Sequence, residues 1–162
     1  MTDDIKWMQA ALECAAEAAA RGEVPIGAVA VVDGTIIARA SNCVEASKDA
    51  TGHAELELLK ACSRIRGDWR MEDVTVYVTK EPCAMCAGAM VNARVKKVVF
   101  GLPDPRSGAC GSALDVAGFP GMLWQVETSG GVLAEESGTM IRNFFKQVRA
   151  SKQAVADGEC RS

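Results

Sequence analysis

Histidine occurs once in this chain of 162 residues, as His53, and it belongs to a His-Ala-Glu motif at residues 53–55. A Pro-Cys-Ala-Met-Cys motif follows at residues 82–86. Imidazole and thiolate groups are strong ligands of transition metals, and three of them on one ion would fix the backbone around each motif. A fold that uses these side chains together must bring the segment around residue 53 against the segment around residue 83.

The ligand set indicates an open metal site. His53, Cys83 and Cys86 can supply one imidazole and two thiolates to Zn²⁺ and leave the fourth tetrahedral position to water, which is typical of catalytic zinc. Glu55 is suited to transferring protons. The same H-x-E and P-C-x-x-C pattern is a known signature of zinc-dependent base deaminases, in which the glutamate acts as general acid and base. We therefore predict one Zn²⁺ per chain, with a bound water or hydroxide, and Glu55 as the catalytic residue.

Each motif alone has a plainer explanation. A Cys-x-x-Cys motif after a strand also occurs as a redox pair, and a lone histidine is commonly a packed core or surface residue. A structural zinc site needs a fourth protein ligand, and the sequence has no second histidine and no second Cys-x-x-Cys motif to provide it. The two motifs together, each opening a helix, favour the catalytic site.

Hydrophobic periodicity and turn residues predict the order of helices and strands. Helices are expected from the N-terminus to about residue 20, over 53–65, after Pro82, and over 134–149. Strands are expected over 26–32, 35–40, 74–79, 97–101 and 124–127, with loops over 41–52 and 102–120. Strands that alternate with helices favour an α/β fold. We predict a three-layer α/β/α sandwich around a mixed five-stranded sheet, with an antiparallel hairpin followed by parallel crossovers.

Size and composition indicate one domain. The 162 residues, of which 49% are hydrophobic, can bury a large core, and no change of composition divides them. We expect a single zinc-dependent deaminase domain over residues 1–150 and a frayed C-terminal tail over residues 151–162.

The N-terminal region and the cysteines point to the cytoplasm. No basic segment followed by a long apolar run is present near the N-terminus, so we expect neither a signal peptide nor a membrane span. The cysteines outside residues 82–86 lack paired spacing, which is typical of reduced thiols. The formal charge of −3 argues against a broad nucleic-acid-coating surface, because phosphate binding needs concentrated lysine and arginine.

Four segments carry a resemblance to a known family. They are Glu-Val-Pro-Ile-Gly-Ala at residues 23–28, the motif at 53–55, Glu-Pro-Cys-Ala-Met-Cys-Ala-Gly-Ala-Met at 81–90, and Phe100-Gly101 with Asp104 and residues 108–112. Through them the chain resembles the bacterial tRNA-specific adenosine deaminases from about residue 5 to residue 149. Those enzymes convert the wobble adenosine of a tRNA anticodon to inosine. The resemblance implies a cytidine deaminase-like fold and the same reaction for this chain.

The resemblance also implies how the substrate is held. Asn42 corresponds to the asparagine that hydrogen-bonds the flipped base, while Val24, Ala54 and Phe145 correspond to positions around the base pocket. The implied phosphate contacts are Arg106, Lys146, Arg149 and Lys152. A tRNA anticodon stem-loop with splayed bases would be the substrate. The resemblance further implies a homodimer, with the pocket completed near the partner chain, and no nucleotide cofactor.

Two other functions remain open from the sequence. A deaminase of free bases or nucleosides, of the guanine or cytosine type, shares the zinc motif but needs no phosphate-binding surface. A non-catalytic, zinc-bearing RNA-binding subunit is the second alternative. Retention of Glu55 disfavours that subunit, because a protein that only binds RNA has no need of a proton shuttle.

Overall fold

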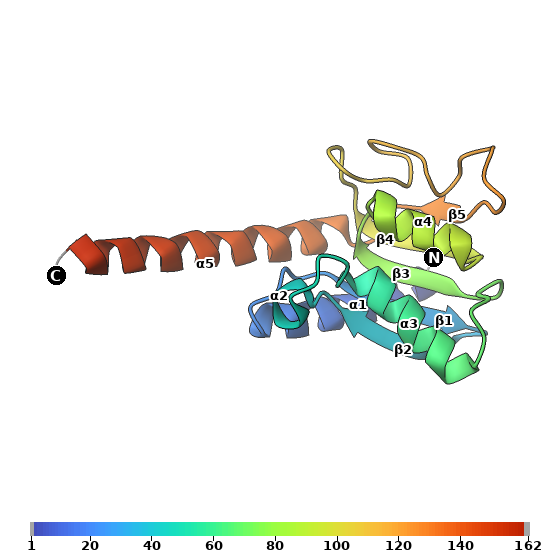
Figure 1. Ribbon diagram of the computed structural model, residues 1–162, viewed down its shortest axis with the longest axis horizontal. Helices are drawn as coiled ribbons and strands as arrows, with labels where there is room; N and C mark the ends of the chain where they lie inside the picture. Colours follow the sequence, from blue (N-terminus) through green and yellow to red (C-terminus); the bar gives the residue numbers. More distant parts are fainter. Residues whose placement is uncertain (1, 161–162) are drawn as a thin grey trace.

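The computed structural model describes residues 2–160 of the chain. The elements follow in the order α1 (Thr2–Ala20), β1 (Gly27–Val32), β2 (Thr35–Ser41), α2 (Val44–Ser47), α3 (Ala54–Arg66), β3 (Thr75–Lys80), α4 (Ala84–Asn92), β4 (Lys97–Leu102), β5 (Glu127–Ser129) and α5 (Ala134–Cys160). The strands form a five-stranded sheet with the order β2-β1-β3-β4-β5, and helices flank it (Figure 1). The predicted α/β fold around a mixed five-stranded sheet is confirmed.

The sheet combines an antiparallel and a parallel half. β1 pairs with β2 and with β3 in antiparallel orientation, whereas β3, β4 and β5 run parallel to one another. Asp33 and Gly34 form the turn between β1 and β2, with φ values of 49° and 72°. Aspartate followed by glycine tolerates these positive φ values, which match the twist of a tight hairpin. The turn therefore forms where the sequence predicts it.

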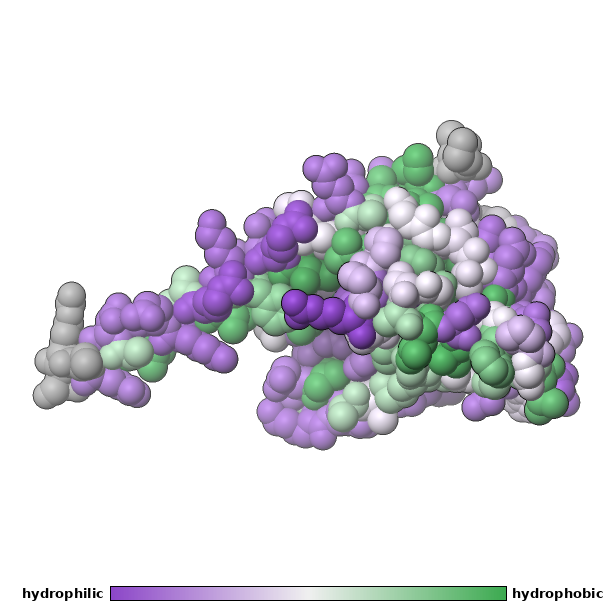
Figure 2. All heavy atoms as spheres, turned by 90° about the horizontal axis from the view of Figure 1, so that it is seen from above, coloured by the Kyte–Doolittle hydropathy of each residue, from purple (hydrophilic) through white to green (hydrophobic). Residues whose placement is uncertain are grey.

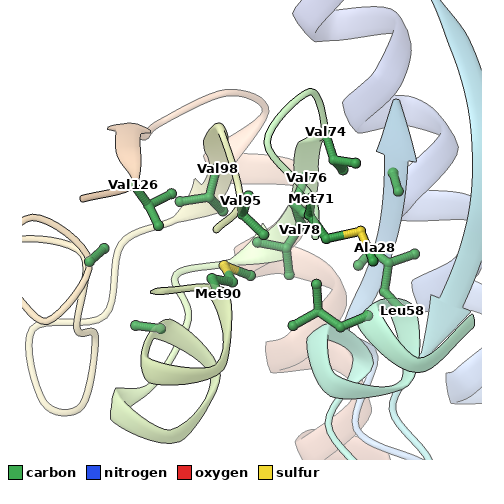
Figure 3. Close-up of a cluster of buried hydrophobic side chains, with 14 of the residues drawn as sticks. Ala28, Leu58, Met71, Val74, Val76, Val78, Met90, Val95, Val98 and Val126 are labelled. Atoms are coloured by element: carbon green, nitrogen blue, oxygen red, sulfur yellow. The ribbon is translucent and has the colours of Figure 1, made fainter. Parts of the chain in front are cut away.

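Alternating side chains of the strands build a separate core on each face of the sheet. On one face, Ala28 of β1, Val78 of β3 and Val98 of β4 belong to the cluster that includes Leu58 of α3 and Met90 of α4 (Figure 3). On the opposite face, the intervening strand residues pack against α1 in a second cluster. This period of two is the expected pattern for a sheet covered on both faces.

Three elements differ from the sequence expectations. A short helix, α2, lies within the segment expected to be a loop. β5 begins at Glu127, where pairing with Lys97 starts, whereas the predicted strand spans 124–127. The indole N–H of Trp124 donates to the carbonyl of Val95 at 2.8 Å. α5 continues through Cys160, past the predicted end near Arg149. The predicted frayed tail is therefore helical where the structure describes it, since alanine, lysine and glutamine in this stretch favour a helix.

The long C-terminal helix projects from the sheet (Figure 1). Its 27 residues span about 40 Å at a rise of about 1.5 Å per residue. Only its first turns lie against the sheet, and polar residues cover most of the projecting part (Figure 2). Among the described residues, no helix combines the length and the apolar character needed to cross a membrane.

Candidate metal and catalytic site

The two sequence motifs meet at the ends of neighbouring helices. His53 is the N-cap of α3, Cys83 is the N-cap of α4, and Cys86 lies in the first turn of α4. The Nδ1 atom of His53 lies 3.6 Å from the Sγ atom of Cys83 and 3.5 Å from that of Cys86. All three ligand atoms lie within 4.8 Å of one another. Nitrogen and sulfur ligands of one tetrahedral zinc ion have separations of this size, because each is only about 2.0–2.3 Å from the metal.

A hydrogen-bonded turn before α3 positions the imidazole. The carboxylate of Asp49 accepts hydrogen bonds from the N–H and the hydroxyl of Thr51 at 2.8 and 2.7 Å. The carbonyl of Asp49 accepts a third from the N–H of Gly52 at 3.0 Å. An added Cβ on Gly52 would lie 3.1 Å from the Asp49 oxygen and 3.1 Å from the nitrogen of Val44. The residue before His53 is therefore closely packed, and the turn fixes the start of α3.

The parallel strands position the cysteines. Lys80 at the end of β3 pairs with Leu102 at the end of β4. Residues that follow the carboxyl ends of parallel strands gather along one edge of the sheet, so Cys83 lies at that edge. The first turns of α3 and α4 present unpaired N–H groups and the positive ends of the helix dipoles, both of which stabilise thiolates.

The two thiols fit a divalent cation. The hydrogen bond from the thiol of Cys86 outweighs partial burial and lowers the pKa of Cys83 to about 5. The same hydrogen bond and burial raise the pKa of Cys86 well above its ordinary value. A metal ion that binds both sulfurs displaces the proton from the Cys86 thiol, because cysteine coordinates a metal as the thiolate. Among the described residues, no further histidine, cysteine or carboxylate belongs to this ligand group, which leaves a coordination position open.

Glu55 lies beside the ligands and is withdrawn from solvent. It occupies the first turn of α3, is 4% exposed, and lines a cavity of about 100 Å³ together with His53 and Cys83. Burial raises the pKa of Glu55 above its ordinary value. Its carboxyl group can therefore hold a proton nearer to neutral pH than an exposed glutamate can. This placement supports the predicted role of Glu55 in proton transfer.

A loop at residues 104–112 forms part of the cavity wall, and the buried carboxylate of Glu81 holds it. Glu81 accepts hydrogen bonds from the N–H groups of Asp104, Cys110 and Ser112 at 3.1, 3.0 and 3.2 Å. It also accepts one from the hydroxyl of Ser112. An added Cβ on Gly108 would lie 2.4 Å from this carboxylate, so only glycine fits there without displacement.

Asp104 is fixed as a carboxylate at the rim of the cavity. Burial alone raises the pKa of Asp104, but the Ser107 hydroxyl, the N–H of Arg106 and the ammonium of Lys80 outweigh it and hold that pKa well below its usual range. The Nζ atom of Lys80 lies 3.2 Å from Oδ2 of Asp104. Both charged groups line the cavity, together with Ile26, Glu81 and Ser107. Lys80 lies outside the sequence motifs from which the site is predicted.

Three of the predicted base-pocket residues, Asn42, Val24 and Ala54, do not line the cavity. Asn42 is buried just after β2, and its side-chain amide donates to Oε2 of Glu23 at 3.3 Å. Val24 is half-buried, and Ala54, the first residue of α3, is fully buried in the core. Their roles in base binding stay predictions.

The remaining predicted substrate contacts also lie outside the cavity lining. Arg106 is exposed beside Ser107, which does line the cavity. The residues Phe145, Lys146, Arg149 and Lys152 are exposed on α5. The structure therefore does not bring these α5 residues to the cavity within one protomer, and their contacts with RNA stay predictions.

Two buried glutamates, to which the sequence motifs assign no role, organise the site. Glu81 holds the cavity loop as described above. Glu23, 1% exposed, accepts hydrogen bonds from the amide of Asn42 and from the N–H groups of Glu45 and Ala46 at the start of α2. The available signal was an acidic residue placed directly beside an apolar strand and a proline, as in Glu23-Val24-Pro25 and Glu81-Pro82.

Comparisons with known proteins agree with this site. The chain matches the MafB19-like deaminase family over residues 2–149. It is 45% identical to the tRNA-specific adenosine deaminase of Bacillus subtilis over 155 residues, which cover 96% of each chain. It also superimposes with a TM-score of 0.80 and 36% identity on a solved structure from work on A-to-I editing by tRNA:A34 deaminases, covering 83% of this chain and 98% of that one.

A guanine deaminase is similar over a smaller part of the chain. The structure of this enzyme from Bacillus subtilis gives a TM-score of 0.58 with 36% identity. The match covers 60% of this chain and 63% of the guanine deaminase. The likeness to the tRNA:A34 deaminase structure is therefore both closer in shape and more complete.

Proposed function

This chain belongs to the MafB19-like deaminases and to the tRNA-specific adenosine deaminases, and we propose that it converts the wobble adenosine of a tRNA anticodon loop to inosine. The reaction is a hydrolytic deamination that releases ammonia. The observation that carries the proposal is the convergence of His53, Cys83 and Cys86 beside the buried Glu55. Similarity to a tRNA-specific deaminase along nearly the whole chain directs that chemistry to RNA.

The chain's own residues divide the work between metal binding and proton transfer. His53, Cys83 and Cys86 would hold Zn²⁺, which supplies a Lewis acid that makes a water molecule nucleophilic near neutral pH. The carboxylate of Glu55 accepts a proton from that water and delivers it to a ring nitrogen of the adenine. Once the hydroxyl has added to the amine-bearing ring carbon, Glu55 accepts the remaining proton of that hydroxyl and delivers it to the amino group, so that the carbon–nitrogen bond breaks, the carbonyl forms and ammonia leaves. Burial raises the pKa of Glu55, so its carboxyl group can both accept and donate a proton nearer to neutral pH than an exposed glutamate can.

The substrate is tested with two sets of compounds. The purified protein is incubated with an anticodon stem-loop that carries a wobble adenosine, and separately with adenine, guanine, cytosine and their nucleosides. We expect ammonia and inosine from the stem-loop, and none when guanosine replaces the wobble adenosine. Ammonia from free bases alone would reject tRNA as the substrate, and no ammonia from any compound would favour a non-catalytic subunit.

A guanine deaminase is the second candidate, favoured by the partial structural match. A free base needs only a closed cavity, whereas an anticodon loop also needs contacts outside it. The same assay separates the two, because guanine deamination yields xanthine and leaves the stem-loop unchanged.

We also propose a homodimer that uses the face formed by α3 and α4. The cavity of about 100 Å³ is smaller than the roughly 300 Å³ at the lower end of ligand pockets, so one protomer alone does not supply a full-sized pocket. A groove of about 580 Å³ runs between these two helices, whose first turns hold the ligands, and Leu56, Trp69 and Ala89 line it. The exposed Trp69 and the half-buried Leu56 and Ala89, close to a cavity too small for a whole ligand, favour a second copy of the chain there.

Sedimentation tests the dimer. Ala89→Arg places a charge in the groove and should give monomers with much lower activity, whereas Ala156→Arg on the exposed end of α5 serves as the control. Fully active Ala89→Arg monomers would contradict the proposal.

The remaining predicted contacts with the RNA and with the target base are proposed for the same reaction. We propose that Arg106 and the exposed cations of α5 bind phosphates of the stem-loop, and that Asn42 and the other base-pocket residues named from the resemblance act in the assembled enzyme. The cytoplasm is the proposed compartment, because tRNA and reduced thiols occur there together.

A further inference from the structure

Lys80 stands at the rim of the catalytic cavity. It is the last residue of β3 and lines the cavity together with His53 and Glu55. Among the described residues that line this cavity, it is the one lysine or arginine. A cation in this position is closer to the reacting groups than any of the cations on α5, none of which lines the cavity.

The ammonium group of Lys80 has N–H donors that its ion pair with Asp104 does not use. A lysine ammonium carries three N–H donors. Within the described part of the chain, its ion-pair partner is Asp104, at 3.2 Å. The side chain is 33% exposed, so the other two donors can reach solvent or a ligand.

The position of Asp104 does not depend on its ion pair with Lys80. Asp104 already accepts hydrogen bonds from the N–H groups of Arg106 and Ser107 at 2.9 and 3.3 Å, and from the Ser107 hydroxyl at 2.7 Å. Those bonds close the turn without Lys80. An ion pair with a partly exposed lysine adds at most a small stabilisation.

The charges of the cavity create a need for a cation when RNA binds. Three carboxyl groups line it, from Glu55, Glu81 and Asp104. A base bound beside Glu55 would leave its sugar and the adjoining phosphate toward the rim, where the ionised carboxylate of Asp104 would repel the phosphate. An ammonium group binds phosphate as a compact point charge.

We propose that Lys80 binds the phosphate adjoining the target nucleoside and so favours a nucleoside within a polynucleotide over a free base. This inference rests on the proposed function and identifies a residue that helps to select its substrate class. Lys80 is thus a specificity residue, in contact with the substrate backbone and outside the proton-transfer chemistry.

The contact is tested by salt dependence with a matched control. kcat/KM for the anticodon stem-loop is measured between low and moderate salt for the unaltered protein, Lys80→Gln, Lys80→Arg and Lys97→Gln. Lys97 is a suitable control because it has similar exposure and one carboxylate partner, Glu127, at the opposite end of the same strand pair. Loss of one phosphate contact should lower kcat/KM about fivefold and reduce the slope of its logarithm against log salt by about 0.7 in Lys80→Gln. Lys80→Arg and Lys97→Gln should keep the original slope.

A neutral substrate linkage tests the same contact in the unaltered protein. Stem-loops are made with a methylphosphonate at the phosphate on either side of the wobble adenosine. At one of the two positions, the neutral linkage should lower both kcat/KM and its salt slope for the unaltered protein. At the same position, it should leave kcat/KM and the salt slope of Lys80→Gln unchanged. Equal losses in both proteins at both linkages, or an unchanged slope in Lys80→Gln, would overturn the assignment of Lys80 while the proposed function stands. No inosine from the unaltered protein would overturn the proposed function and this assignment with it.

Discussion

At the scale of single residues, the proposed mechanism assigns metal binding to His53, Cys83 and Cys86 and proton transfer to Glu55, and a substitution of Glu55 tests this division. Glu55 does not belong to the ligand group, so Glu55→Gln should retain zinc. The turnover rate of Glu55→Gln should fall by at least about 10²–10⁴-fold, because the glutamine amide cannot accept and donate the proton. Zinc content and inosine release measure the two effects. Glu57→Gln, which removes a surface ion pair with Lys60 on the same helix, should leave both unchanged.

The contribution of Asp104 to the stability of the fold depends on pH. Its pKa is lowered in the folded protein, so its ionised form stabilises the fold at pH values above the unfolded pKa of about 3.9, and this stabilisation is lost as the pH falls through the lower folded pKa. Asp104→Asn should therefore lower the free energy of unfolding by about 1–2 kcal/mol at pH 7. Urea unfolding of both proteins should show this difference narrow below about pH 4. A difference that stays constant down to pH 2 would show that the ionised carboxylate is not its source.

At the scale of elements, the loop at 104–112 depends on close contact with the segment between β3 and α4. Gly108→Ala would place a Cβ 2.4 Å from the Glu81 carboxylate and 2.5 Å from the Asp104 carbonyl oxygen. We expect destabilisation of about 1–3 kcal/mol, and a higher KM because the loop moves away from the cavity. Thermal unfolding and stem-loop kinetics measure these effects. Gly158→Ala in α5 is the control, because no atom lies within 4 Å of its added Cβ, and it should be neutral or slightly stabilising.

The sequence predicts elements whose causes are local and misses those whose causes are distant. The Asp33-Gly34 turn and the helix starts at His53 and Cys83 depend on neighbouring residues, and the structure has them where expected. The start of β5 depends on pairing of Glu127 with Lys97 on a distant strand, so the local pattern places the strand too early. The contacts that hold the cavity loop likewise join Glu81 to residues far along the chain, and periodicity carries no information about them.

At the scale of the whole molecule, the chain consists of a sheet covered by helices and a long helix, α5, that projects from it (Figure 1). The proposed metal ligands and Glu55 lie at the starts of α3 and α4, on one face of the sheet, whereas α5 starts on the face that packs against α1. The predicted RNA contacts on α5 therefore approach the substrate from outside the cavity. A ligand long enough to reach both must extend well beyond one base, which agrees with a stem-loop substrate.

Truncation of the distal part of α5 tests whether this part contributes to RNA binding without contributing to the stability of the fold. Residues 151–159 are exposed throughout, so a chain that ends at Ala150 should unfold at nearly the same temperature as the full chain. It lacks Lys152, and we expect KM for the stem-loop to rise a few-fold at moderate salt, with kcat unchanged, because one phosphate contact is lost. Full chains carrying Lys152→Gln should reproduce this rise, whereas Gln153→Ala should not. A truncated chain with the original KM would show that the distal helix does not touch the RNA, and the phosphate contacts would then lie nearer to the cavity rim.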